Sequence, residues 1–450
     1  MRSLSCLLLS ALSLSSYSAD FESTSFSSLI ANEYRPYIIN SDSQMLPAGH
    51  GAYFARPTGM SVTESGKYVL FHNNLPKIPL SGDSTEGGYF IKNTETNETT
   101  RLGVPSELPK NTVIGNPTIS PNGRYIGFSY QESYRTYKGV VWDRLEDKLL
   151  TARYSDEVNS DCINSPSYFN IYPINEKYAY YSYMCSTNNK WGSNTEEVIG
   201  FTDIENEQSK VINIGLDGKL SKLFLSPNRF ISNDGRYLTY VSPQQMDNNN
   251  FYSGSESETA IYLYDRVTSK HAKVISSQSN TDYIHNSLYS SISPDGKFLI
   301  YIAKKPMSET SSSNFGYLVT YSIDTKKFNY IAGPDNKILY DIRNPTISRD
   351  GESIAFTSKN SEYNLIGGNG YQAYFYDRVN QKMHHVSVSI LTGESALQSG
   401  DAVVYGNGKG LIWSTSSPLV DKREVGANSG KFLYALSKST IPDICKPYLE

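Results

Sequence analysis

A single pattern of polar and apolar positions recurs along most of the chain. Each copy has a polar turn, one charged residue, and then alternating apolar positions that end in an aromatic side chain. Four clear copies span residues 119–128, 231–240, 292–301 and 347–356, and three weaker copies span 62–71, 172–181 and 404–413. The turn position is held by Gly66, Gly123, Glu176, Gly235, Gly296, Gly351 and Gly408, at intervals of 53 to 61 residues. A regular period of this kind is typical of repeat architectures, in which each unit buries its apolar face against its neighbours.

The chemistry of the turn predicts a β-hairpin. In Ser-Pro-Asp-Gly, proline presets φ at the first central position and glycine accepts the positive φ that the turn requires. Glu176 departs from this chemistry, so we expect it to cost stability. Five residues after each turn position stands an aromatic, namely Phe71, Phe128, Tyr181, Tyr240, Tyr301, Phe356 and Trp413. We interpret these aromatics as packing between adjacent repeats.

A third strand follows each hairpin and is marked in three repeats by an aromatic-Asp-Arg triplet, beginning at Trp142, Tyr264 and Tyr376. The short Asp side chain in each triplet can cap the following turn. Four strands per repeat with no helix between them are typical of a propeller blade. The sequence therefore predicts an all-β fold, a seven-bladed β-propeller with four antiparallel strands per blade.

These motifs also carry a family resemblance. The turn, the charged residue, the strand ending in an aromatic and the aromatic-Asp-Arg strand together resemble the TolB-type, WD40-like (PD40) propeller repeats of exported bacterial proteins. The resemblance covers roughly residues 50–440 and implies the fold but no particular role, because such repeats serve many functions. TolB itself places an α/β domain before six blades, so its role in the Tol–Pal system is not expected here.

The N-terminal residues predict export. Arg2 precedes a Leu-rich apolar stretch over residues 4–14, and small residues at positions 16, 18 and 19 offer a cleavage site. About a dozen apolar residues are too few to span a bilayer, which needs roughly 20. We expect residues 1–19 to be a signal peptide, 20–50 an N-terminal segment able to supply a ring-closing strand, and 51–450 the propeller. The expected location is periplasmic or extracellular, with no membrane insertion.

The net charge and the motif content limit the classes of partner and activity that we expect. The formal net charge is −4 and the chain has no basic run, which argues against nucleic acid as a partner. No Walker loop, HExxH, EF-hand loop or GxSxG motif is present, and no α/β domain follows the repeats, so a prolyl-peptidase-type hydrolase is not expected. We predict no cofactor and no metal site. The oligomeric state is left open.

Three cysteines remain after removal of a signal peptide. Cys162 precedes the first strand of the third repeat and Cys185 ends its second strand, so both fall toward the same face on neighbouring strands. We therefore predict a disulfide between them, with Cys445 free.

Candidate ligand-binding residues lie where the first strand of each repeat begins, around the predicted channel. Alignment of these entries places Asn116, Asn228 and Asn344 at equivalent positions, with Tyr289 and Asp401 in two other repeats. Loops rich in Asn, Gly and aromatics reach the same face and bring Trp191, with Tyr168 close to the strand entries. Such residues can bind sugar hydroxyls or a peptide backbone. Equally, each Asn can cap its own loop, and the loops can be ordinary solvated connections.

A catalytic alternative uses the same face. Some polysaccharide lyases are seven-bladed propellers, and uronate β-elimination needs a base at C5 and a cation to neutralise the carboxylate. His285, in an entry loop beside Tyr289, is the preferred base, and Arg343 of the adjacent repeat can neutralise the carboxylate. His50 and the arginines at other strand entries, Arg56 and Arg229, are further candidates.

The leading interpretation is an exported binding or scaffold propeller that recognises a glycan or an envelope protein through its loop-rich channel face. The alternative is a secreted polysaccharide lyase that uses His, Tyr and Arg on that face. Binding predicts scattered polar and aromatic groups, whereas catalysis predicts that these groups converge in one pocket.

Overall fold

The computed structural model describes most of the repeats. The described residues are 34–38, 52–54, 60–73, 88–96, 98–133, 136–151, 167–189, 192–216, 220–221, 223–226, 228–242, 260–274, 290–303, 316–332, 339, 341–359, 370–388, 396, 398–408, 410–415 and 432–438.

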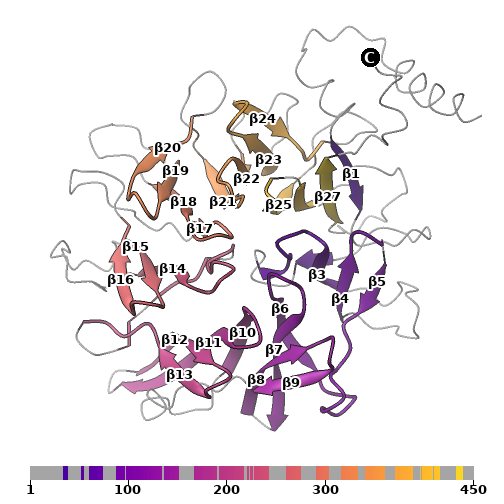
Figure 1. Cartoon of the computed structure of the whole chain (residues 1–450), viewed down its shortest axis with the longest axis vertical. Helices are drawn as coiled ribbons and strands as arrows, with labels where there is room; N and C mark the ends of the chain where they lie inside the picture. Colours follow the sequence, from indigo (N-terminus) through magenta and orange to yellow (C-terminus); the bar gives the residue numbers. More distant parts are fainter. Residues whose placement is uncertain are drawn as a thin grey trace, which may run out of the picture.

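The strands form antiparallel sheets that follow one another around a common centre (Figure 1). We number the sheets in chain order from the first hairpin. Sheet 1 is β2 (Ala52–Phe54), β3 (Tyr68–Asn73), β4 (Gly88–Asn93) and β5 (Thr99–Arg101). Sheet 2 is β6 (Ile114–Ile119), β7 (Tyr125–Ser133), β8 (Thr136–Asp143) and β9 (Lys148–Thr151). Sheet 3 is β10 (Ser167–Pro173), β11 (Tyr178–Asn189), β12 (Gly192–Asp203) and β13 (Gln208–Val211).

The second half of the ring repeats this order. Sheet 4 is β14 (Tyr237–Ser242), β15 (Ala260–Asp265) and β16 (Lys270–Lys273). Sheet 5 is β17 (Ser290–Ile292), β18 (Phe298–Ala303), β19 (Tyr317–Ser322) and β20 (Phe328–Tyr330). Sheet 6 is β21 (Ile342–Ile347), β22 (Ser353–Ser358), β23 (Gln372–Asp377) and β24 (Lys382–His385). Sheet 7 is β25 (Ser399–Tyr405), β26 (Gly410–Thr415) and β27 (Phe432–Lys438), with β1 (Tyr34–Ile38) as its outermost strand.

The prediction of a seven-bladed propeller with four antiparallel strands in every blade is wrong as it stands. Six sheets are four-stranded, whereas sheet 4 has three strands among the described residues. The described chain before β14 makes isolated bridges, from Phe224 to Val241 and from Ile231 to Leu238. Between these bridges, Asn228 and Arg229 contact residues of distant sheets.

Sheets 7 and 1 meet through packed side chains. Val403 and Ile412 of sheet 7 form one apolar cluster with Val69 and Phe71 of sheet 1. The ring of Tyr405 also lies against Gly66, so closely that a Cβ there would stand 2.1 Å from it. The glycine thus serves both the turn, with φ of 75°, and the contact between sheets.

The turn at Glu176 has a different backbone conformation from the others. Glu176 is not among the residues with positive φ, whereas the glycines at the other six turn positions all are. The backbone nitrogens of Ile174 and Asn175 both donate to the Tyr178 carbonyl, at 3.0 and 3.3 Å. The hydroxyl of Tyr125, from the preceding sheet, donates to the Glu176 carboxylate at 3.4 Å. This turn therefore accepts a side chain without positive φ, and the expected loss of stability stays a prediction.

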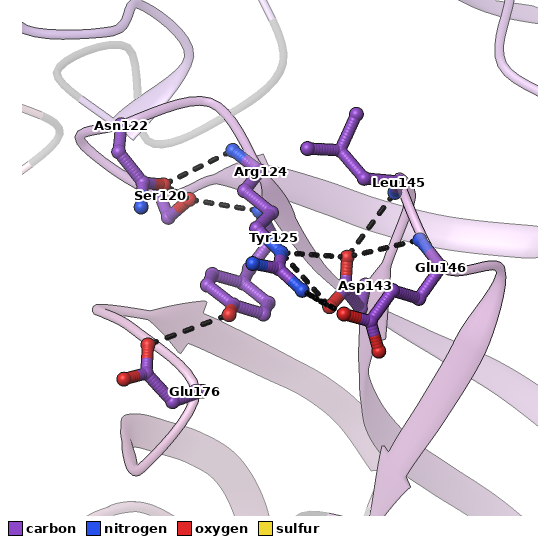
Figure 2. A network of polar contacts seen from close by, with 8 residues as sticks. All are labelled: Ser120, Asn122, Arg124, Tyr125, Asp143, Leu145, Glu146 and Glu176. Carbon is purple, nitrogen blue, oxygen red and sulfur yellow. Dashed lines mark hydrogen bonds and ion pairs between the residues drawn. The ribbon is translucent and has the colours of Figure 1, made fainter.

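In sheets 2 and 4, the charged residue after the turn binds the Asp of the third strand. In sheet 2, Arg124 reaches Asp143 with Nε at 2.9 Å and Nη2 at 2.6 Å from Oδ2 (Figure 2). Asp143 is nearly buried and also accepts the backbone N–H groups of Leu145 and Glu146. The predicted capping of the turn is confirmed at this Asp. Sheet 4 repeats the pair as Arg236 and Asp265.

We expect Asp143→Ala to lower the free energy of unfolding by about 2–3 kcal/mol, because it removes a charge-assisted pair and two backbone caps together. Hydrogen bonding to Arg124 holds the pKa of Asp143 below its usual range. The wild-type contribution is therefore present above the unfolded pKa, near 4, and is lost as pH falls through the lower folded pKa.

The urea unfolding midpoints of wild type and Asp143→Ala, at pH 7 and at low pH, measure the loss of stability and its pH dependence. Asp265→Ala is the matched control, because its pair with Arg236 is more exposed and longer, at 3.1 Å, and a smaller loss is expected. Equal losses in the two variants would contradict this assignment.

The core lies between neighbouring sheets. The strand-ending aromatics at 71, 128, 181, 240, 301, 356 and 413 are all buried. Trp413 shows the arrangement: it clusters with Ala355, Ala373 and Phe375 of sheet 6. The prediction that these aromatics pack between repeats is confirmed.

Candidate functional site

The ring has two faces, set by the direction of the strands. The hairpin face carries the turns between first and second strands, at residues 66, 123, 176, 235, 296, 351 and 408. The loop face is the opposite one, where first strands begin and second strands end. The predicted ligand residues were placed on the loop face.

The centre of the ring is crossed by Asn228 and Arg229 of sheet 4. Asn228 is fully buried and its Nδ2 donates to the carbonyl of Pro345 in sheet 6, at 3.0 Å. Arg229 is 6% exposed; its Nη1 donates to Oδ1 of Asn233 at 2.7 Å, and its Nη2 lies 3.5 Å from the Val62 carbonyl near the sheet 1 turn. Sheets that are not neighbours in the ring are therefore joined across its axis.

Glu64 completes this connection on the hairpin face. One carboxylate oxygen accepts from Nδ2 of Asn233 in sheet 4, and the other from Nη1 of Arg349 in sheet 6, both at 2.6 Å. We call Glu64, Arg229, Asn233 and Arg349 the axial network. Burial lowers the pKa of Arg229 to about 10, and the Glu64 carboxylate opposes that shift. The guanidinium is thus still charged at neutral pH, with Glu64 as its counter-charge.

Asn116 and Asn344 begin a repeated Asn-Pro-Thr segment at a bulge of the inner strand. Both have positive φ, 48° and 49°, which Asn tolerates better than most residues. Nδ2 of Asn344 donates to Oδ1 of Asp401 in sheet 7, at 2.6 Å. Asn228 and Asn344 therefore bind across sheets, so the alternative that each caps its own loop is wrong for these two. Asn228 also lies outside any strand and is not equivalent to the other two.

The loop face of sheet 6 gathers two cations around one tyrosine. The Arg343 guanidinium lies 4.3 Å from the centre of the Tyr371 ring, and Nζ of Lys359 lies 4.6 Å from it. Arg343 and Lys359 are exposed and Tyr371 is half-buried. The positions follow from the topology, because Arg343 is near the start of β21, Lys359 follows β22, and Tyr371 precedes β23. We call these three residues the cationic cluster.

Asp341 is the acidic neighbour of the cationic cluster. Burial raises the pKa of its carboxyl, while the nearby Arg343 and Lys359 oppose this shift. Its carbonyl accepts from the Ser358 hydroxyl at 2.8 Å, which ties it to the end of β22. Among the described residues of this region, one carboxylate acts electrostatically on two cations, which leaves an excess of positive charge there.

Several predicted site residues lie outside the described residues. These are His50, Arg56, Cys162, Trp191, His285, Tyr289 and Cys445; for Tyr168 and Cys185 only the backbone is described, in β10 and β11. The disulfide, and the grouping of His285, Tyr289 and Arg343, therefore stay predictions. Arg343 itself is described, with Tyr371 of its own sheet as its neighbour.

The described histidines pack against aromatic rings of the sheets. His271 accepts or donates a hydrogen bond with the Tyr240 hydroxyl at 2.8 Å, and His72 contacts the Tyr89 ring edge-on. The sequence places His384 and His385 in the outer strand of their repeat, which predicts surface positions, but His385 is 6% exposed and stacks on Tyr374. The prediction is wrong for His385.

His385 predicts a pH dependence of stability. Burial lowers its pKa to about 4. Between pH 6.5 and 4, the unfolded chain protonates the His385 imidazole and the folded chain does not. The free energy of unfolding therefore decreases as the pH is lowered through this range. We expect His385 to account for a loss of about 2 kcal/mol between pH 7 and pH 5. Urea midpoints of wild type and His385→Gln over that range measure it; identical slopes would show that His385 does not titrate as described.

Three residues were missed by the sequence interpretation: Lys359, Asp341 and Glu64. Lys359 precedes the loop over residues 360–371, whose Asn, Gly and Tyr content was noted while the charge beside it was not. Glu64 lies in a polar turn that nothing in the sequence distinguishes from the other hairpin turns. Arg229 was considered as one of the arginines near strand entries, but its place on the axis was not predicted; it stands where the similar Asn-Pro-Thr segments carry proline, at positions 117 and 345.

In the described part of the chain, no helix has the length and apolarity needed to span a membrane. The same residues contain no group of three or more His, Cys, Asp or Glu placed to hold a metal ion.

No family model matches the sequence, and no curated protein does. Among solved structures, the β-propeller domain of the trilobed protease from Pyrococcus furiosus is 13% identical with a TM-score of 0.45, over 86% of this chain and 94% of that one. Dipeptidyl peptidase 4 of Porphyromonas gingivalis is 11% identical with a TM-score of 0.43, over 84% and 50%. Acylaminoacyl peptidase of Pyrococcus horikoshii is 13% identical with a TM-score of 0.45, over 78% and 48%. The chain spans about half the length of these two peptidases, and the likeness is one of propeller fold alone; membership of the TolB-type family is not confirmed.

Proposed function

We propose that this chain is a binding propeller that recognises a glycan through its loop face. The observation that carries the proposal is the cationic cluster at the strand entries of sheet 6. There the exposed side chains of Arg343 and Lys359 both lie against the ring of Tyr371. Guanidinium, ammonium and phenol groups together offer many donors on a nearly rigid support, which suits a ligand covered in oxygen atoms.

The apolar surface favours a glycan over an envelope protein as the ligand. The buried core of a protein interface is more apolar than the rest of the surface. Among the described residues, the exposed large hydrophobics come from different places in the ring. Leu145, Val267 and Val379 follow the third strands of three sheets, Leu216 follows β13, and Val113 precedes β6. The third strands end toward the hairpin face, away from the cationic cluster.

The axial network supports use of the loop face. Contacts among sheets 1, 4 and 6 fill the centre on the hairpin side, where Glu64 bonds Asn233 and Arg349. Glu64, whose two carboxylate oxygens already bind Asn233 and Arg349, is a poor candidate for ligand exchange. Export to the periplasm or beyond, inferred from residues 1–19, is part of this proposal and would expose the loop face to envelope or extracellular glycans.

Affinity electrophoresis of the purified mature protein against ulvan, alginate, pectate, glycosaminoglycans and neutral polysaccharides tests the proposal. We expect retention on at least one glycan, lost in Tyr371→Ala with the thermal midpoint nearly unchanged, and no rise in ultraviolet absorbance. Retention on none of them, or retention that Tyr371→Ala leaves intact, would refute binding at this face. A rise in absorbance that His285→Ala abolishes would establish the lyase alternative instead.

A further inference from the structure

We infer that the loop face of sheet 6 selects glycans carrying carboxylate or sulfate groups, and that Arg343 and Lys359, which share the Tyr371 ring, bind such a group. This inference rests on the proposed function and adds the ligand class and the groups that determine it.

The two cations are close enough to act on one ligand. Both lie within 4.6 Å of the centre of a single ring, so the Arg343 guanidinium carbon and the Lys359 nitrogen stand no more than about 9 Å apart. Their positive charges repel each other. Tyr371 reduces this cost through its ring face, but a ring supplies no negative charge, so the pair still favours an anion.

The cationic cluster can bind an anion because it has two positive charges and one nearby carboxylate, that of Asp341. Asp341 acts electrostatically on both cations, yet it is a single carboxylate and its side chain is partly buried beside β21. Among the described residues, neither Arg343 nor Lys359 forms an ion pair with it or with another carboxylate. Within this part of the chain, their donors can therefore bind an incoming carboxylate or sulfate in a bidentate or charge-assisted manner.

Asp341 opposes the incoming anion through its charge. Its carboxylate acts electrostatically on both cations and repels a second negative group near them. A polymer with several negative groups can offset this repulsion by making several contacts at once, which a single free anion cannot. Removing the charge of Asp341 should strengthen anion binding, whereas removing either cation should weaken it.

Isothermal titration with three matched oligosaccharides tests this: an oligouronate, its carboxyl-reduced neutral form, and a sulfated oligosaccharide. For the oligouronate, we expect Arg343→Ala and Lys359→Ala each to weaken binding at least about tenfold. We expect Asp341→Asn to strengthen it about two- to fivefold. Lys382→Ala, at an exposed position of β24 in the same sheet, is the matched control and should leave affinity unchanged.

The ligands separate the outcomes. Tighter binding of the oligouronate than of the sulfated sugar assigns the carboxylate as the natural group, and the reverse assigns the sulfate. Equal binding of the neutral form, unaffected by Arg343→Ala, would overturn the inference while leaving glycan binding intact. Binding of none of the three, with capture of an acidic peptide that Arg343→Ala abolishes, would overturn both the inference and the proposed function.

Discussion

Trp413→Ala should lower the free energy of unfolding by about 3–5 kcal/mol, one of the two largest effects expected for a single substitution in this chain. Trp413 is fully buried in β26 and packs on Ala355 and Ala373 of sheet 6. These partners are already small, so they cannot extend to fill the space that the indole leaves. The variant would therefore carry a cavity between two sheets.

Urea unfolding of wild type, Trp413→Ala and Trp413→Phe measures the effect. The phenylalanine variant retains most of the volume and should lose about 1–2 kcal/mol. An unchanged midpoint in Trp413→Ala would mean that the aromatic is exposed and that packing between sheets 6 and 7 is misassigned.

Glu64→Ala should cost about 3–4 kcal/mol, because it removes three interactions at once. Asn233 loses its charged acceptor, Arg349 loses its ion pair, and the buried Arg229 loses its counter-charge. The last loss matters most, since an uncompensated guanidinium would remain at the centre of the ring.

A double-mutant cycle tests this reasoning. In the Glu64→Ala background, Arg229→Met removes the uncompensated charge, so the double variant should be less destabilised than the sum of the two single variants by about 1–2 kcal/mol. Glu95→Ala is the control: Glu95 also pairs with a cation in sheet 1, Lys67 at 2.6 Å, but it is 61% exposed and should matter by less than about 1 kcal/mol. Strict additivity would show that Glu64 and Arg229 are not coupled across the axis.

Features set by local chemistry could be predicted from the sequence. The turn glycines, the buried aromatics five residues later and the capping Asp of the third strand all depend on short-range geometry. The role of the charged residue after the turn was not predicted, because its partner stands about 20 residues away: Arg124 and Asp143 meet only when β7 and β8 pair.

Features set by the closed ring could not be predicted. Asn228 aligns with Asn344 in sequence, yet one lies on the axis and the other in a strand bulge, because only a complete ring brings Pro345 within reach of Asn228. For the candidate site, Arg343 was predicted from its position at a strand entry, whereas Lys359 and Asp341 acquire their role only by converging on Tyr371.

The central claim is that an acidic sugar binds at the loop face of sheet 6, and a crystal structure of the mature protein with a bound oligouronate tests it most directly. We expect a sugar carboxylate within hydrogen-bond distance of both Arg343 and Lys359, with the axial network around Glu64 unchanged. A sugar bound on the hairpin face, or one on the loop face without contact to either cation, would contradict the account.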